Sequence, residues 1–433
     1  MRDIGIGLIG AGVVGGGVVK ILRDRIPSFR DSLGLPLRLV RVVDKDASRL
    51  SELPVGEALC SGEAEDILAD SAVDVVVELV GGTGFAHRLV CDALRRGKHV
   101  VTANKALLAE RGPDIFESAG AGSASVHFEA AVGGGMPVIK TIRETLVGNR
   151  ISSVRTIING TCNYILSEMT SRGLPFDKAL EAAQRKGYAE ADPSLDVGGG
   201  DTGHKIAIMA SLLYGGYVPF ESISIEGITG IEPEDIACAA ELGYCVKLLG
   251  IINSDDDGGT VDVRVHPAML RTNHILASVS GVFNAVQMRG DRVGEMLVYG
   301  KGAGEMPTAS AVVGDIVDVA RDIKAGSPQR FSTDFYRADN ILRPRSSERL
   351  RSRYYLRLNV VDRPGVLAAI AAGFGAHEIS VASVMQREGA SPESVPVVFL
   401  THAAEERSLR AALVEIEKLD CVKGTAKVLR IEE

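Results

Sequence analysis

The sequence predicts an α/β protein with an N-terminal Rossmann-type parallel sheet, an inserted α+β domain and a C-terminal ferredoxin-like domain. Three observations predict it. A glycine-rich turn follows the first strand, strands and helices alternate up to about residue 131, and a βαββαβ order fills the end of the chain. At 433 residues the chain has room for about two to four domains.

The N-terminal turn has the pattern of a dinucleotide-binding loop. A strand over residues 4–9 leads into Gly10-Ala11-Gly12-Val13-Val14-Gly15, and a helical pattern follows. In such a loop the first glycine permits the tight turn, the second admits the pyrophosphate, and the third lets helix and strand pack closely. The alternative is a glycine-rich strand-turn-helix without a ligand.

The end of the second strand bears on the choice of dinucleotide. Residues 37–43 form this strand, and Asp44-Lys45 follows. An acid here binds the ribose hydroxyls and favours NAD, whereas a nearby cation can accept the 2′-phosphate of NADP. Asp44 indicates the first and Lys45 permits the second, so the residues leave NAD and NADP open.

Later strands of this sheet end in further candidate ligand groups. Gly81–Gly84 and Lys105 follow the strands over residues 73–79 and 99–102, at the sheet edge where ligands of such folds bind. The alternative for Lys105 is a solvated lysine at a helix start. After the next strand, Glu129 precedes the run Gly133–Gly135, which can expose carbonyl oxygens of the kind that hard cations prefer. The alternative there is a glycine hinge between domains.

The stretch from Gly187 to Lys205 is unusually rich in ionisable groups. Asp201 is expected near a helix N-terminus, and Lys205 lies one turn later on the same face. Glu190 and Asp192 lie on the incoming loop, and Asp196 is grouped with Asp192 as a loop acid. The simpler interpretation is a capped helix with one ion pair. Beside a dinucleotide loop, we favour the substrate side of a hydride-transfer site.

Composition excludes several other classes. The net charge is −8, Trp is absent and aromatic residues make up 5% of the chain, which disfavours a nucleic-acid binder. The sequence has no apolar run long enough to span a membrane. Six scattered cysteines without a CxxC pair fit reduced thiols, and the N-terminus reads as a strand, not a signal peptide. We therefore expect a cytoplasmic protein without a nucleic-acid or membrane partner.

The motifs taken together resemble one family, homoserine dehydrogenase with a C-terminal ACT regulatory domain. They are GAGVVG from Gly10, TANKALL from Thr102, FEAAVGGGMP from Phe128, NGTCNYIL from Asn159, GYAEADPSLDVGGGDTGHK from Gly187, GKGAGEMPTASAV from Gly300 and DRPGVL from Asp362. Their joint occurrence in this order is more specific than any one of them. The resemblance implies NAD(P)-dependent interconversion of L-aspartate 4-semialdehyde and L-homoserine in threonine and methionine biosynthesis.

The resemblance also implies roles for single residues. The implied catalytic residues are Lys205, Lys105 and Asp201, and the implied substrate-binding residues are Glu190, Asp201 and Gly187. The implied cofactor-binding residues are Gly10, Ala11, Gly12, Val13, Val14, Gly15, Asp44, Lys45, Lys105, Gly187 and Gly302. A structural monovalent cation, Na⁺ or K⁺, is implied at Glu129, Val132, Gly134 and Met136. Family members that use NADP commonly carry an arginine at the end of the second strand, where this chain has Val43-Asp44 followed by Lys45, so NAD is a serious alternative.

The expected domain boundaries follow from these assignments. Residues 1–136 form the nucleotide-binding domain, completed by about 303–340, and residues 137–302 form the substrate-binding and dimerisation domain. Residues 341–352 are a linker, and residues 353–433 form the ACT domain, with feedback by threonine implied. A homodimer or homotetramer is expected because ACT domains often pair across subunits. Two alternatives are another NAD(P)-dependent amino-acid dehydrogenase and a non-catalytic cofactor or amino-acid sensor.

Overall fold

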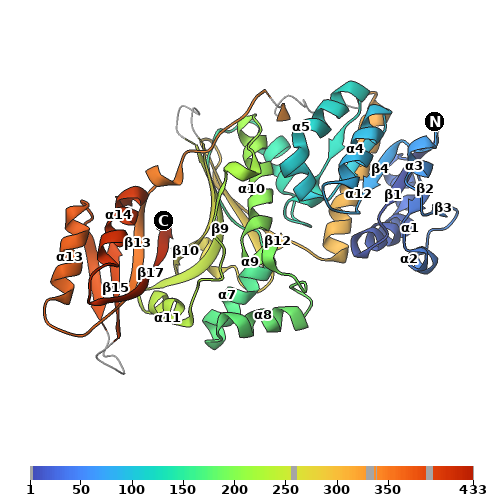
Figure 1. Cartoon of the computed structure of the whole chain (residues 1–433). Coiled ribbons are helices and arrows are strands. Elements are labelled where there is room, and N and C mark those ends of the chain that lie inside the picture. Colours follow the sequence, from blue (N-terminus) through green and yellow to red (C-terminus); the bar gives the residue numbers. More distant parts are fainter. Residues whose placement is uncertain (1–2, 255–260, 328–335, 338, 387–393, 433) are drawn as a thin grey trace.

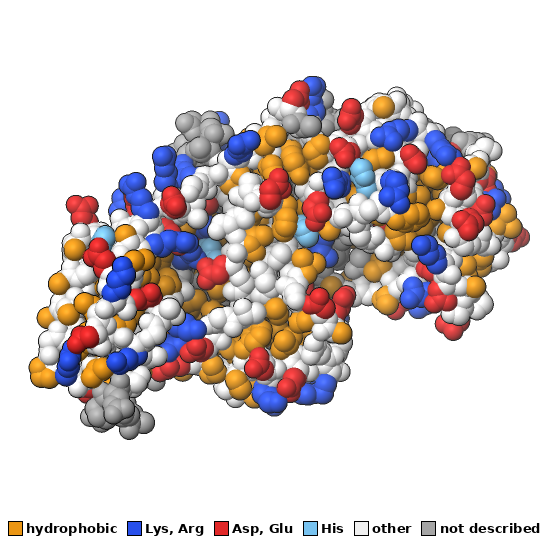
Figure 2. Space-filling model, in the orientation of Figure 1, with side chains coloured by type: hydrophobic (Ala, Val, Ile, Leu, Met, Phe, Trp, Pro, Cys, Tyr) orange, Lys and Arg blue, Asp and Glu red, His pale blue; other side chains and the backbone are white. Residues whose placement is uncertain are grey.

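The computed structural model describes residues 3–254, 261–327, 336, 337, 339–386 and 394–432. The nucleotide-binding region, a central sheet with its helices, and the C-terminal domain follow one another along an elongated molecule (Figure 1). Acidic and basic side chains are interspersed along the face shown in Figure 2, without a single basic stripe.

The first sheet is parallel and has the strand order β3-β2-β1-β4-β5-β6. Its strands are β1 (Ile4–Ile9), β2 (Leu37–Val43), β3 (Leu59–Ser61), β4 (Val75–Glu78), β5 (His99–Thr102) and β6 (Val126–His127). The strand order reverses between β1 and β4, and at this switch point the carboxyl ends of the strands form a crevice for ligands. The α/β fold with an N-terminal parallel sheet is confirmed.

Helices cover both faces of this sheet. On one face, α1 (Val13–Leu33) packs with α12 (Glu305–Ala325), which returns from much later in the chain. On the other face, α4 (Phe85–Arg95) packs with α5 (Lys105–Gly122). Shorter helices α2 (Ala47–Glu52) and α3 (Glu65–Ala69) connect the strands on the β3 side. The continuous apolar strands, such as Val75–Val77, are buried by these two helical layers.

The second sheet is mixed and runs from the middle of the chain into the C-terminal domain. Its order is β12-β11-β7-β9-β10-β17-β13-β15-β14, with β8 beside β10 and β16 beside β13. Its strands are β7 (Ile151–Ile157), β8 (Ser224–Ile225), β9 (Tyr244–Ser254), β10 (Val261–Arg271), β11 (Phe283–Gly290), β12 (Gly294–Lys301), β13 (Arg351–Val360), β14 (Val381–Gln386), β15 (Val395–Thr401), β16 (Ala404–Glu405) and β17 (Val422–Glu432).

The helices on this second sheet fall into two groups. The middle of the chain contributes α6 (Val138–Lys140), the π-helical turn η2 (Thr141–Thr145), α7 (Gly160–Arg172), α8 (Phe176–Arg185), α9 (Ser194–Val197), α10 (Gly200–Tyr214) and α11 (Pro233–Glu241). The C-terminal domain contributes α13 (Val366–Ala376) and α14 (Glu406–Ile416), which complete the predicted βαββαβ order. Short 3-10 turns are η1 (Glu129–Ala131), η3 (Phe220–Ser222), η4 (Ile275–Ser278) and η6 (Ser347–Arg349).

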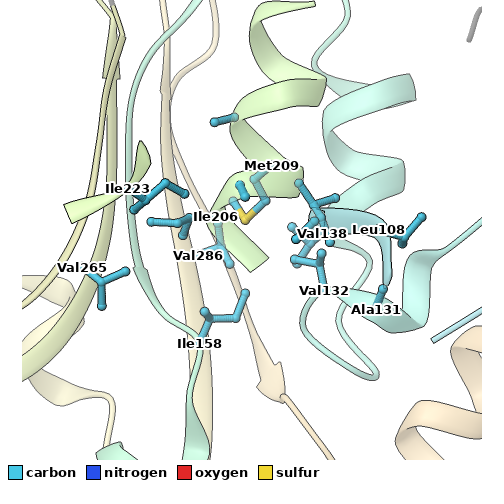
Figure 3. Packing of buried hydrophobic residues seen from close by; sticks show 14 of the residues in the cluster. Leu108, Ala131, Val132, Val138, Ile158, Ile206, Met209, Ile223, Val265 and Val286 are labelled. Carbon is cyan, nitrogen blue, oxygen red and sulfur yellow. The ribbon is translucent and has the colours of Figure 1, made fainter. Parts of the chain in front are cut away.

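One apolar core joins the nucleotide-binding region to the second sheet. Figure 3 shows Leu108 and Val132 from the first region, and Val138 directly after it, beside Ile206 and Met209 of α10. All five side chains are fully buried. This core packs α10 closely against the edge of the nucleotide-binding region.

The sequence did not predict that the two later domains share a sheet. We expected an inserted α+β domain and a separate C-terminal ferredoxin-like domain, joined by a linker over residues 341–352. Instead β17 continues to Glu432, and its final residues pair in parallel with Ala268–Leu270 of β10. The sequence of β17 indicates a strand but carries no information on its neighbour.

A buried charge cluster reinforces this junction. The Arg357 guanidinium on β13 is 3% exposed and donates to Asp235 at 2.7 Å, Glu234 at 2.8 Å and Glu232 at 2.6 Å. These acids lie at the N-terminus of α11, where carboxylates also complement the helix dipole. The neighbouring acids hold the pKa of Arg357 above its usual range despite its burial. The C-terminal domain is thus bound to the middle domain by backbone pairing and by this cluster.

We predict that Arg357→Met destabilises the chain by about 3 kcal/mol, because it leaves Asp235 charged, buried and uncompensated. Urea unfolding of Arg357→Met and of Arg357→Met/Asp235→Asn measures this loss, and the double variant should recover part of it. Arg363→Met, which removes an exposed ion pair with Asp420, is the control and should leave the unfolding midpoint nearly unchanged. An unfolding midpoint of Arg357→Met equal to that of the wild type would contradict the prediction.

Candidate functional site

The loop after β1 is built so that its backbone is open to a ligand. Gly10 has φ of 99°, and a Cβ there would lie 2.6 Å from the backbone of Leu79. A Cβ on Gly15 would lie 2.0 Å from the carbonyl oxygen of Gly10, so helix and strand approach closely. A Cβ on Gly12, at the start of α1, would lie 3.8 Å from the Arg49 guanidinium, an ordinary contact, and the first turn of α1 carries no acid. A helix N-terminus of this kind attracts phosphate.

A cavity of about 710 Å³ extends from this loop across the end of β2. The Asp44 carboxylate on its wall accepts hydrogen bonds from the backbone N–H of Ala11 at 2.7 Å and of Asp46 at 2.9 Å. Lys45 is exposed, and its ammonium lies 5.7 Å from the centre of the Phe85 ring. The structure therefore brings Asp44 directly to the glycine loop and leaves Lys45 on the rim.

The ionisable residues of the second candidate site come from two regions. Lys105 is the first residue of α5, which the Asn104 side chain caps. Its ammonium lies 3.2 Å from one oxygen of Asp201. The other oxygen of Asp201 accepts a hydrogen bond of 2.7 Å from Lys205, one turn later on α10. One carboxylate thus lies between two ammonium groups that the sequence separates by a hundred residues.

Charge decides the state of this carboxylate. Asp201 is 4% exposed, and burial alone would raise its pKa. The ammonium groups of Lys205 and Lys105, with hydrogen bonds from Lys205 and Asn159, outweigh burial and lower the pKa to about 2. Asp201 therefore stays ionised at neutral pH and holds both lysines in place.

Lys205 is held from two sides. Besides Asp201, its ammonium donates at 2.8 Å to the carbonyl oxygen of Ile158, at the end of β7. The residue is only 9% exposed. An ammonium has three N–H groups, so one remains for a substrate.

Asn159 and Asp196 extend the site in a way that sequence reasoning missed. The Asn159 amide donates to Asp196 at 2.7 Å and to Asp201 at 2.8 Å, while its oxygen caps α7. Burial, with the nearby charge of Asp201, raises the pKa of Asp196. We had placed Asp196 with Asp192 among the loop acids. Asp192 is indeed exposed and bonded to Ser194, but Asp196 points back to Asn159, and the i,i+5 spacing to Asp201 gave no clear signal of this.

Two predicted substrate residues lie on the surface. Gly187, with φ of 72°, and Glu190 are both exposed on the loop between α8 and α9. Within the described residues the Glu190 carboxylate forms no ion pair, and only its backbone oxygen is engaged, by Gln184 at 3.1 Å. The structure does not bring Glu190 into contact with Asp201 or Lys205.

The predicted cation loop adjoins the predicted cofactor residue Gly302. A Cβ on Gly134 would lie 2.4 Å from the carbonyl oxygen of Gly302. The Glu129 carboxylate is already engaged, accepting from the backbone of Ile139 and Lys140, each at 2.8 Å. Burial raises the pKa of Glu129 to about 7. Any cation in this loop would therefore depend on backbone oxygens.

Comparison with known proteins identifies the family. The homoserine dehydrogenase family model matches residues 137–317, its NAD-binding domain model matches residues 10–129, and the ACT domain model matches residues 354–421. The homoserine dehydrogenase of Neisseria gonorrhoeae is 43% identical over 100% of this chain and 99% of that protein. The chain belongs to the homoserine dehydrogenase family.

Other members of the family agree. The homoserine dehydrogenase of Synechocystis is 42% identical over 98% of this chain and 99% of that protein. The crystal structure of a homoserine dehydrogenase from Thiobacillus denitrificans matches with a TM-score of 0.93 and 42% identity, over 100% of this chain and 99% of that one. A hyperthermophilic archaeal homoserine dehydrogenase, described in complex with NADPH, matches with a TM-score of 0.63 and 25% identity, over 74% of this chain and 98% of that one.

Family membership settles the activity at the level of the reaction. Homoserine dehydrogenases are nicotinamide-dependent oxidoreductases that interconvert L-aspartate 4-semialdehyde and L-homoserine, as the sequence motifs predicted. The ACT domain model adds a domain suited to amino-acid regulation. No helix among the described residues is long and apolar enough to cross a membrane.

Proposed function

We propose that this homoserine dehydrogenase family member uses Lys205 as the proton donor for aldehyde reduction and as the proton acceptor for homoserine oxidation. The observation that carries the proposal is the buried Lys205 ammonium, fixed by Asp201 and by the Ile158 carbonyl. A group so held keeps its orientation when the substrate arrives, which is what proton transfer requires.

The reduction requires positive charge beside the carbonyl oxygen of the substrate. Reduction of the semialdehyde leaves negative charge on the former carbonyl oxygen, and an ammonium beside that oxygen both stabilises the charge and supplies the proton. A bound nicotinamide supplies the hydride. Lys105, across Asp201, is the second cation at this point and the alternative proton donor.

We assign binding of the substrate's ammonium to Asp201 together with Glu190 and Gly187 of the preceding loop. Asp201 is ionised, but Lys105 and Lys205 already balance its charge, so Glu190 would supply most of the attraction for the substrate's ammonium. Glu190 is exposed on the loop that precedes α9 and is free of ion pairs among the described residues, so it is available to a substrate.

We predict that Lys205→Ala lowers kcat for homoserine oxidation by at least about 100-fold, the usual contribution of a general acid or base. Cofactor binding, followed by nicotinamide fluorescence, should survive, because Lys205 contacts Asp201 and Ile158, not the glycine loop. Lys178→Ala, an exposed lysine on α8, is the control. A loss below about 10-fold in Lys205→Ala would assign the proton transfer to another group.

We propose that the cofactor lies with its pyrophosphate on Gly10–Gly15 and its adenosine ribose at Asp44, and that NAD is preferred. The support is the position of Asp44, whose carboxylate is tied to the Ala11 N–H and would repel a 2′-phosphate. Lys45, which could accept that phosphate, is on the rim. Lys105, Gly187 and Gly302 complete the proposed cofactor contacts.

Homoserine oxidation with NAD and NADP side by side tests this preference. We predict that kcat/KM is at least about 10-fold higher with NAD, because one charge repulsion or one lost hydrogen bond at the ribose costs about 1.4 kcal/mol or more. Asp44→Ser should lower the NAD:NADP ratio by a similar factor. Asp46→Asn, which keeps the cap of α2, should not change it. A wild-type enzyme that favours NADP would contradict the assignment.

We also propose a structural monovalent cation, Na⁺ or K⁺, at Glu129, Val132, Gly134 and Met136. The support is a loop with two successive left-handed glycines, Gly133 and Gly134, beside Gly302. Such a cation would be held by backbone oxygens, because the Glu129 carboxylate caps α6. It would fix the loop against the proposed cofactor site without entering the reaction.

For the C-terminal domain we propose threonine as the effector and a homodimer or homotetramer as the assembly. The support is the turn Asp362–Val366, in which Gly365 has φ of 91° at the start of α13. ACT domains bind amino acids at such turns and often pair across subunits. We place the protein in the cytoplasm, since all six cysteines are free thiols.

Threonine should inhibit homoserine oxidation by the wild type, and Gly365→Val should abolish the inhibition, because a β-branched residue is strained at positive φ. Initial rates over a threonine titration measure the effect. Methionine and isoleucine titrations serve as controls, and inhibition by either one in place of threonine would identify a different effector. The rate of Gly365→Val without threonine should stay within about 2-fold of wild type, because the turn lies in the C-terminal domain, away from Lys105, Asp201 and Lys205.

A further inference from the structure

The two helices that carry the proposed catalytic lysines touch at a second polar contact. Helices α5 and α10 lie side by side (Figure 1). Lys105 meets Asp201 at the N-terminal ends of the two helices. Farther along, Nε2 of His204 lies 3.2 Å from a carboxylate oxygen of Glu110. His204 directly precedes Lys205, and Glu110 lies five residues after Lys105.

The surroundings of His204 leave it few other orientations. The residue is 4% exposed, and its ring lies 4.1 Å from the ring of Phe220, tilted by 34°. A Cβ on Gly203 would lie 2.9 Å from Phe220, so Phe220 packs directly onto the backbone of α10. The imidazole is thereby held between Phe220 and Glu110. With the proton on Nε2, the neutral ring donates to Glu110.

Apolar packing alone would not fix how these helices sit along each other. Leu108 of α5 and Met209 of α10 belong to the same core (Figure 3). Apolar contacts are non-directional and tolerate small sliding, whereas a hydrogen bond does not. Lys105 and Glu110 are separated by about 7.5 Å along α5, so two polar contacts at this spacing fix both the rotation and the axial position of the helix.

We propose that His204 and Glu110 form a positioning pair that holds α5 against α10 and so keeps the Lys105 ammonium at Asp201 in the substrate site. This proposal rests on the proposed function, because it concerns where Lys105 stands during turnover. Neither residue touches the reacting atoms in it. They act through Lys105: if the pair is lost and the Lys105 ammonium shifts by about 1 Å, it no longer has the position that the reaction requires.

Variants at His204 separate the hydrogen bond from the packing. His204→Phe keeps an aromatic ring on Phe220 but has no donor, whereas His204→Gln offers an amide N–H to Glu110. We expect His204→Phe to lower kcat for homoserine oxidation about 10-fold or more. His204→Gln should recover kcat to within about 3-fold of wild type. Equal losses in both variants would overturn the proposal.

Variants at Glu110 test the pair from its partly exposed side, where the side chain is 38% exposed and folding is least at risk. Glu110→Ala should reproduce the loss in kcat, while Glu117→Ala, an exposed acid on the same helix, should not. An unchanged kcat in Glu110→Ala would overturn the proposal.

A double-mutant cycle with Lys105 shows whether the pair acts through that lysine. In a Lys105→Ala background, His204→Phe should change the residual kcat by less than about 2-fold, because the group that it positions is gone. Losses that multiply would show a merely structural role and overturn the proposal. Wild-type turnover of homoserine is measured in the same series, and its absence would instead contradict the proposed function itself.

Discussion

The interaction on which the site depends is the buried Asp201 carboxylate between Lys105 and Lys205. Asp201 and Lys205 are both buried, so each alone would meet a desolvation penalty. Together the three groups leave one net positive charge at the proposed site of proton transfer. The same three groups join two regions of the chain, so the electrostatics of the proposed site and the contact between these regions depend on the same residues.

The backbone around this triad is shaped by close approach. Gly10 and Gly15 admit the turn after β1, and Gly134 packs on Gly302 at distances that no Cβ allows. These glycines bring the carboxyl edge of the first sheet next to the end of β12. The cavity beside the glycine loop and the two lysines therefore lie at the same edge of the sheet, which suits the proposed hydride transfer between two bound molecules.

Local patterns in the sequence predicted much of the fold and part of the site. The GAGVVG turn, the buried strands and the start of α10 at Gly200 all follow from short-range signals. Pairings between distant segments did not. The position of Lys105 after β5 predicted that it belongs to the site, but nothing in the sequence predicted its contact with Asp201. Asp196 was predicted to be a loop acid. The sequence also did not predict which strands pair with β17, because the pattern of one strand carries no information on its neighbours.

Strand β17 belongs to two domains at once. Along most of its length it pairs with β13, and its last residues pair with β10, where Glu432 also accepts a hydrogen bond from Arg264 at 2.9 Å. A domain joined by a flexible linker can move independently of its neighbour, but a domain whose strand is paired into the neighbour's sheet cannot. A conformational change in the C-terminal domain must either break these backbone hydrogen bonds or cross into the neighbouring domain as a change in the twist of a common sheet.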